Sequence, residues 1–123
     1  MNPTTKEKIL TTLSYFSFGI IGFVLLLIGE VKTHFMKYHV YQSILIGLLV
    51  MFLNYGIDIL SGFSLDILGL IPGLQGYGVT IIVLLKNILH IAEFGMLIYC
   101  VIGIWRNQYT WIKWISEQIH RMI

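Results

Sequence analysis

Ionisable side chains recur in an apolar stretch of the C-terminal half, and they are the residues best suited to chemistry. Lys86, His90 and Glu93 follow at spacings of four and three, which places them on one face of a helix. An ionisable group inside a bilayer costs about 2.5 to 3.5 kcal/mol on insertion scales, so these groups must face protein or water. Asn54 and Asp58, four residues apart in the preceding apolar stretch, could supply their partners.

This spacing predicts specific contacts between the two stretches. We expect Asp58 to pair with Lys86, and His90 and Glu93 to form a second contact. The intramembrane polar set comprises Asn54, Asp58, Lys86, Asn87, His90 and Glu93. It fits an interhelical clamp, a hydrophilic groove for a passing substrate, or a proton relay. No Asp, Glu, His, Lys or Arg lies between Phe94 and Trp105, and this absence argues against proton pumping.

The sequence offers no enzyme site. Its four histidines are scattered, and none forms the H-x-x-x-H pair typical of a helical metal motif. The single cysteine, Cys100, excludes an internal disulfide and is expected to be a packing residue inside an apolar stretch. We therefore predict a non-enzymatic protein with no catalytic residues, no metal ion and no cofactor.

The composition indicates a membrane protein. Of the 123 residues, 57% are hydrophobic and only 11% are charged, whereas soluble domains carry about 25% charged residues. The mean hydropathy is +0.83. A net charge of +2 without a run of basic residues gives no indication of nucleic-acid binding.

The apolar stretches predict an all-α integral membrane protein, a single membrane domain over residues 1–123. A helix needs about 20 apolar residues to cross a bilayer, and three segments are long enough, at about 9–29, 38–60 and 79–105. Residues 61–78 are rich in glycine and contain Pro72, which suits an interfacial or re-entrant loop. Residues 108–123 form an amphipathic helix suited to the membrane interface. Four spans, with a break near Lys86 to His90, are the alternative.

The basic residues predict the orientation of these spans. Those in the first loop and the C-terminal segment outnumber those at the N-terminus: Lys32, Lys37, Arg106, Lys113 and Arg121 against Lys6 and Lys8. Cytoplasmic loops carry an excess of Lys and Arg. We therefore place the first loop and the C-terminus on the cytoplasmic side, or on the stromal side in a plastid.

The segment that enters the second span is the most specific motif in the chain. Phe35, Tyr38 and Lys37 match a membrane interface, where aromatic side chains and lysines meet the headgroups. A plain interfacial anchor explains these residues but not Gln42. His39 and Gln42, three residues apart, would point to one side of the first helical turn, available to the bundle or to a partner.

This segment resembles the F-V-R-F-(H/N)-x-x-Q-(A/G/S) signature of the Tic-twenty family, which includes a subunit of the chloroplast inner-envelope import translocon and bacterial relatives. The matching residues are Phe35, His39, Gln42 and Ser43, with Lys37 and Tyr38 as conservative replacements. Leu13-Ser14-Tyr15 and Asn87 add weaker similarity. The resemblance implies an all-helical membrane protein, with these six residues at an interface with a partner or with lipid.

The expected function follows from the resemblance. It implies a membrane subunit that contributes helices to a larger complex, with a role in protein translocation, in a bacterial inner membrane or a plastid inner-envelope or thylakoid-type membrane. The alternatives are an accessory or assembly subunit of another membrane complex and a small oligomeric transporter. The expected partners are the lipid bilayer and either other membrane subunits or further copies of this chain.

Overall fold

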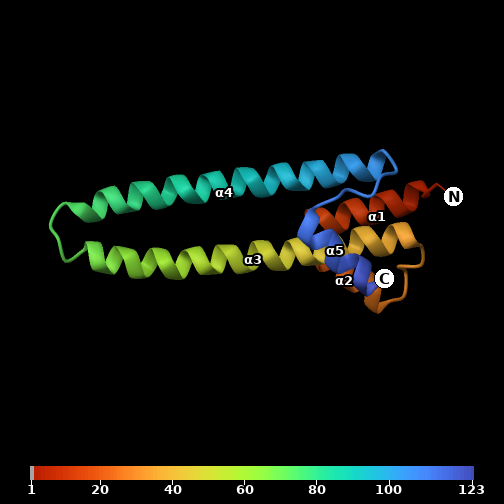
Figure 1. Cartoon of the computed structure of the whole chain (residues 1–123), viewed down its shortest axis with the longest axis horizontal. Helices are drawn as coiled ribbons and strands as arrows, with labels where there is room; N and C mark the ends of the chain where they lie inside the picture. Colours follow the sequence, from red (N-terminus) through yellow and green to blue (C-terminus); the bar gives the residue numbers. More distant parts are fainter. Residues whose placement is uncertain (1) are drawn as a thin grey trace. The chain divides into compact units, whose positions relative to one another are not determined.

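The computed structural model describes residues 2–123, and the prediction of an all-α protein is confirmed (Figure 1). The five helices are α1 (Thr5–Phe16), α2 (Ile20–Leu27), α3 (His34–Leu68), α4 (Leu74–Trp105) and α5 (Lys113–Met122). They form two compact units. Unit 1 contains the chain up to Leu49 together with Met96–Ile123, and unit 2 contains Val50–Gly95.

The residues of the predicted first span, 9–29, do not form one continuous helix. Two short helices, α1 and α2, replace it, and three residues, Ser17 to Gly19, separate them. Phe18 and Gly19 both have positive φ angles, of 54° and 88°, a conformation that ends a helix. The Ser17 hydroxyl accepts a hydrogen bond at 3.0 Å from the backbone N–H of Ile21, which lies in the first turn of α2.

The turn between α1 and α2 packs closely against α3. A Cβ atom added to Gly19 would meet the backbone of Ile44, and one added to Gly47 would meet the carbonyl group of Phe18. The two glycines therefore permit a backbone-to-backbone approach that no larger residue allows. This approach stabilises the sharp reversal of the chain, which apolar periodicity alone does not reveal.

The two long helices contain the other two predicted spans. Within residues 2–123, α3 and α4 are the two helices long and apolar enough to cross a membrane. The loop predicted over residues 61–78 is much shorter in the structure, because α3 continues to Leu68 and α4 begins at Leu74. Pro72, which lacks an N–H, and Gly73, with φ 87°, make the reversal between them. Helix α4 runs unbroken through Lys86 to His90, so the break that the four-span alternative places there is absent from the described residues.

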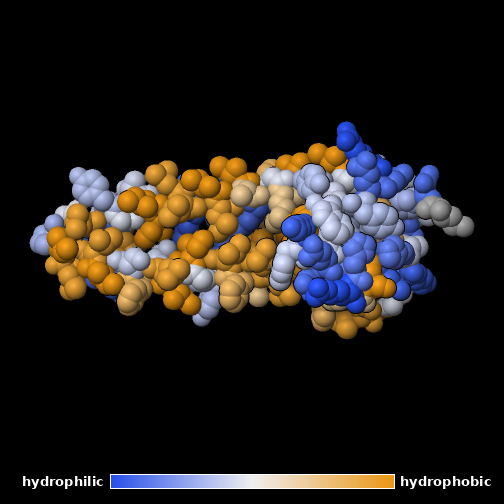
Figure 2. All heavy atoms as spheres, in the orientation of Figure 1, coloured by the Kyte–Doolittle hydropathy of each residue, from blue (hydrophilic) through white to orange (hydrophobic). Residues whose placement is uncertain are grey.

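Unit 2 is an antiparallel hairpin of the two long helices. Its less exposed residues recur every three or four positions, which is the pattern of two helices packed along one seam. They include Asn54, Ile57, Ser61, Leu65 and Leu68 on α3, and Gly78, Ile82, Lys86, Leu89 and Glu93 on α4. The rest of the surface is apolar and exposed, including Phe52, Leu60, Phe63, Ile88 and Ile91. On the face that Figure 2 shows, apolar surface covers most of the hairpin and hydrophilic surface gathers over unit 1.

Unit 1 closes around the C-terminal segment. Helix α4 ends where Asn107 adopts a φ of 58°, and α5 begins only at Lys113, five residues later than the predicted amphipathic helix. The apolar face of α5 does not face outward, because Ile115 and Ile119 are buried within the unit. Trp111 and Trp114 remain exposed. The helix therefore uses Ile115 and Ile119 for tertiary packing, whereas Trp111 and Trp114 are free to meet a membrane interface.

Two glycines of α3 provide a test of this packing. Gly47→Ala is expected to lower the stability by about 1 to 3 kcal/mol, because its methyl group meets the Phe18 carbonyl and forces the turn to move. Gly56 lies in the same helix, and a Cβ there meets nothing within 4 Å. Gly56→Ala is therefore the matched control, expected to be neutral or slightly stabilising. Thermal unfolding of the detergent-solubilised variants measures the difference, and equal midpoints would contradict the close approach.

Candidate functional site

The predicted site residues fall into two clusters, one in each unit. The intramembrane polar set lies along the seam of unit 2, and the motif residues at the start of α3 lie in unit 1. The hydrogen bonds and ion pairs of each cluster join residues of a single unit.

The seam of unit 2 contains the predicted ion pair. Nζ of Lys86 lies 2.6 Å from Oδ1 of Asp58, so the pair joins α4 to α3. Both side chains remain partly exposed, Asp58 at 61% and Lys86 at 38%. A pair of two helices is too thin to enclose these charges, and the surroundings are apolar. The two charges therefore neutralise each other, but both side chains remain accessible to the surroundings of the hairpin.

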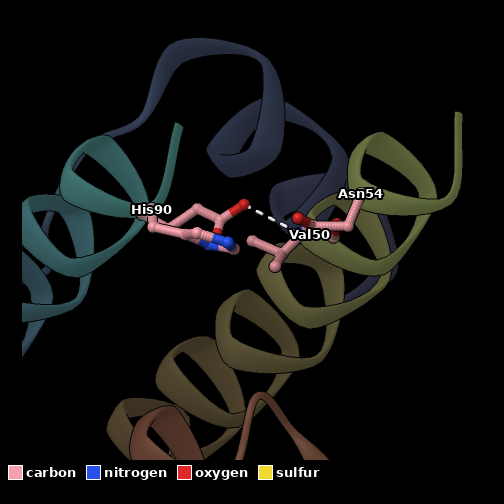
Figure 3. Close-up of polar contacts among 4 residues, drawn as sticks. Val50, Asn54 and His90 are labelled. Atoms are coloured by element: carbon pink, nitrogen blue, oxygen red, sulfur yellow. Dashed lines mark hydrogen bonds and ion pairs between the residues drawn. The ribbon is translucent and has the colours of Figure 1, made fainter. Parts of the chain in front are cut away.

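A second contact lies about one helical turn along the seam. The Asn54 amide donates one hydrogen bond to Oε1 of Glu93 at 2.9 Å and another to the backbone carbonyl of Val50 at 2.8 Å. Oε2 of Glu93 lies 3.3 Å from Nδ1 of His90. Figure 3 shows Val50 and Asn54 of α3 facing His90 of α4. Both oxygens of the nearly buried Glu93 carboxylate therefore have a polar partner.

These contacts join five of the six residues of the predicted polar set. The sixth, Asn87, is exposed on α4, and its side chain makes no hydrogen bond to any part of residues 2–123. The geometry matches an interhelical clamp, because each polar group on α4 that reaches the seam meets one on α3. The unexpected feature is the exposed flank of the clamp, formed by Asp58, Lys86 and His90, whose imidazole is 60% exposed.

In unit 1, Gln42 links α3 to the non-helical segment that follows α4. Its Nε2 donates to the backbone carbonyl of Thr110 at 2.9 Å, and its Oε1 accepts from the Thr110 hydroxyl at 3.0 Å. The carbonyl can only accept, so it fixes the orientation of the amide. Tyr15 of α1 donates its hydroxyl proton to the same Oε1. Gln42 therefore joins three separate parts of the unit.

His39 makes the same three-way connection one turn earlier in α3. Its Nε2 lies 2.9 Å from the backbone carbonyl of Gln108, which can only accept, so this nitrogen carries the proton. Its Nδ1 lies 3.0 Å from the hydroxyl of Tyr15. That hydroxyl thus stands between two acceptors, Nδ1 of His39 and Oε1 of Gln42. The ring of Phe35 packs on the imidazole with the ring centroids 4.5 Å apart.

Two hydroxyl contacts complete the network. Tyr38 donates to the Thr110 carbonyl at 2.6 Å, and Ser116 of α5 lies 2.8 Å from the same Tyr38 hydroxyl. Because the Tyr38 proton is already used, Ser116 is the donor. Ser43 likewise donates to the Val40 carbonyl at 2.7 Å and bonds Ser14 of α1. The polar groups of the non-helical segment are in this way satisfied by side chains of α3.

The motif residues therefore do not form the expected interface with a partner or with lipid. Phe35, Tyr38, His39, Gln42 and Ser43 are all buried inside unit 1, and only Lys37 is exposed. The sequence analysis did not identify Thr110 and Ser116, which are hydrogen-bond partners of these residues. In the sequence, each is only a polar residue near the apolar residues that α5 buries.

Comparisons with protein families, with curated proteins and with solved structures found no match.

The Gln42 network predicts a large effect of its removal. Gln42→Ala leaves the Thr110 carbonyl with one bond fewer and the Thr110 hydroxyl without its acceptor, while the Tyr15 hydroxyl keeps Nδ1 of His39 as an acceptor. Each unsatisfied buried group costs about 1 to 3 kcal/mol. The exposed Gln75 in the first turn of α4 is the matched control, and Gln75→Ala should leave the unfolding midpoint unchanged. Similar midpoints for the two variants would show that the network does not stabilise unit 1.

The ion pair of the seam can be measured by a double-mutant cycle. Asp58→Asn and Lys86→Met are each expected to lower the thermal stability, because each leaves one charge without its partner in apolar surroundings. The double variant should recover part of the loss, with a coupling of about 0.5 to 3 kcal/mol. Additive losses in detergent would show that the 2.6 Å contact contributes nothing and that solvent compensates each charge.

Proposed function

We propose that this chain is a non-enzymatic integral membrane subunit whose α3–α4 hairpin crosses the bilayer and contributes helices to a larger membrane complex. The observation that carries the proposal is the exposure of the two most apolar helices. Of the most apolar 18 residues of each helix, only 22% in α3 and 11% in α4 are buried. A core helix of a soluble protein would be mostly buried, so this surface requires lipid or protein around it.

The distribution of charge supports an orientation with unit 1 on the cytoplasmic or stromal side. Every Lys and Arg of the chain except Lys86 lies in unit 1. Unit 2 carries Asp58, Asp66 and Glu93 against this one lysine, so its net charge is negative. Because α1 and α2 are two short helices rather than one span, Lys6 and Lys8 join the same side as the other basic residues. With two spans, the basic residues of unit 1 all lie on one side of the membrane. This arrangement fits the positive-inside rule better than three spans, which would place Lys6 and Lys8 on the opposite side.

The apolar α2 fits this arrangement as part of a re-entrant hairpin with α1. Its outward residues Ile20, Phe23 and Leu27 are 56% to 70% exposed. Non-helical backbone at membrane depth is tolerated only where protein covers it. The turn at Phe18 and Gly19 meets this condition, because it packs on Ile44 and Gly47 of α3. In this proposal α1 and α2 enter the membrane from the cytoplasmic or stromal side and return to that side.

The role within a complex rests on the resemblance of the Phe35 to Ser43 segment to the translocon family. Protein translocation is the process that this resemblance implies. The buried network around His39 and Gln42 supports a structural role for the motif, which then sets the fold of unit 1 rather than contacting substrate. An accessory subunit of another membrane complex would have the same hairpin. The identity of the proteins that co-purify in mild detergent distinguishes this role from a role in protein translocation.

Cysteine accessibility tests the topology. In a Cys100→Ala background, cysteines at Lys32 and Glu117 should be protected from a membrane-impermeant thiol reagent in intact cells, and a cysteine at Gln75, beside the short turn, should be labelled. All three positions are exposed in the structure. Disruption of the cells should make Lys32 and Glu117 variants reactive and provides the control. Opposite accessibility of Lys32 and Glu117 would contradict the two-span arrangement, and extraction of the chain by alkaline carbonate would contradict membrane insertion.

A further inference from the structure

The exposed flank of the seam, formed by Asp58, Lys86 and His90, is a polar surface on an otherwise apolar hairpin. The exposed fractions of the side chains are 61% for Asp58, 38% for Lys86 and 60% for His90. Each of the three has a polar partner within the hairpin, but no part of the hairpin covers it. The ion pair lies about 15 Å from the turn along α3 and about 18 Å along α4, at a rise of about 1.5 Å per residue. In a hydrocarbon layer about 30 Å thick this is close to the middle.

Charged groups at that depth almost always face the interior of a helix bundle or water. The hairpin by itself provides no interior, so another surface must cover the flank. We propose that the covering surface is the same flank of a second copy of this chain, so that the two hairpins form a four-helix dimer. This inference rests on the proposed membrane insertion of the hairpin and names the partner.

The charge pattern is self-complementary under two-fold symmetry. In a symmetric dimer the same patch faces itself, and residue i contacts residue j in both directions. When the axis runs along the hairpin and the flanks face each other, α3 of each copy lies over α4 of the other. Asp58 then faces the partner's Lys86, and Lys86 faces the partner's Asp58. All four charges stay at one depth, so each carboxylate is shared between two ammonium groups.

The surface beside the charges also permits a close approach. Gly62 lies four residues after Asp58, on the same face of α3, and a Cβ there would meet nothing within 4 Å. Small residues of this kind let helices pack closely where lipid provides no hydrophobic driving force. A second copy thus replaces lipid both at the charges and along the helix backbone next to them.

A charge-swapped chain tests the dimer without breaking the pair inside each hairpin. The double variant Asp58→Lys/Lys86→Asp keeps one positive and one negative group at the seam. It is complementary to itself, but against the wild-type chain it places like charges opposite each other. Differently tagged full-length chains are co-expressed in pairs (wild type with wild type, swap with swap, and wild type with swap) and purified through one tag in mild detergent.

The control variant Lys6→Glu/Glu30→Lys reverses the exposed ion pair of unit 1, whose atoms lie 3.8 Å apart, and is co-expressed with the wild type.

Wild type with wild type, swap with swap, and control with wild type should co-purify equally. Wild type with swap should fall by about tenfold or more, because like charges facing each other across an interface are strongly disfavoured. Equal recovery in all combinations would overturn the proposed contact, and so would the absence of any self-association, since another subunit or water would then cover the flank. The membrane fraction of each chain is measured in parallel, so that failure of insertion is distinguished from failure of the dimer.

Discussion

The carbonyl group of Thr110 accepts hydrogen bonds from Tyr38 and from Gln42, and the packing of unit 1 depends on these two bonds. They hold the non-helical segment between α4 and α5 against the first turns of α3. A carbonyl in this position is buried among apolar side chains and would be costly without partners. The same two side chains reach α1 through Tyr15 and α5 through Ser116. A few polar groups thus link α1, α3, α5 and the segment between α4 and α5.

The two clusters solve the same physical problem differently. Both take polar groups into apolar surroundings, where each group needs a partner. In unit 1 the partners are neutral and the network is buried, so its bonds are shielded from competing water. In unit 2 the charges are paired across a seam of only two helices and remain exposed on one flank. The first arrangement is complete within the chain, whereas the second is complete only when something covers the flank, which is why we infer a second copy there.

The segment from Phe35 to Ser43 has a structural role inside unit 1. In the sequence, His39 and Gln42 share one side of the first helical turn and could face either the helix bundle or a partner. In the structure both have no exposed surface and bind Tyr15, Gln108 and Thr110 of the same chain. Their chemistry is that of a structural network, in which histidine and glutamine are useful because each presents two polar atoms to different elements. The surface open to a partner then consists of the apolar hairpin and the exposed tryptophans of unit 1.

The sequence by itself determined the all-α class, the two long apolar helices and the pairing of Asp58 with Lys86. Hydropathy and helical periodicity act over neighbouring residues, and the spacing of four fixes which side chains share a face. The sequence did not reveal the break at Ser17 to Gly19 within an apolar stretch, nor the burial of the apolar face of α5. Those features depend on contacts between distant residues, such as Gly47 with the Phe18 carbonyl and Ser116 with Tyr38. Only the tertiary structure decided them, because each requires a partner surface to replace lipid or water.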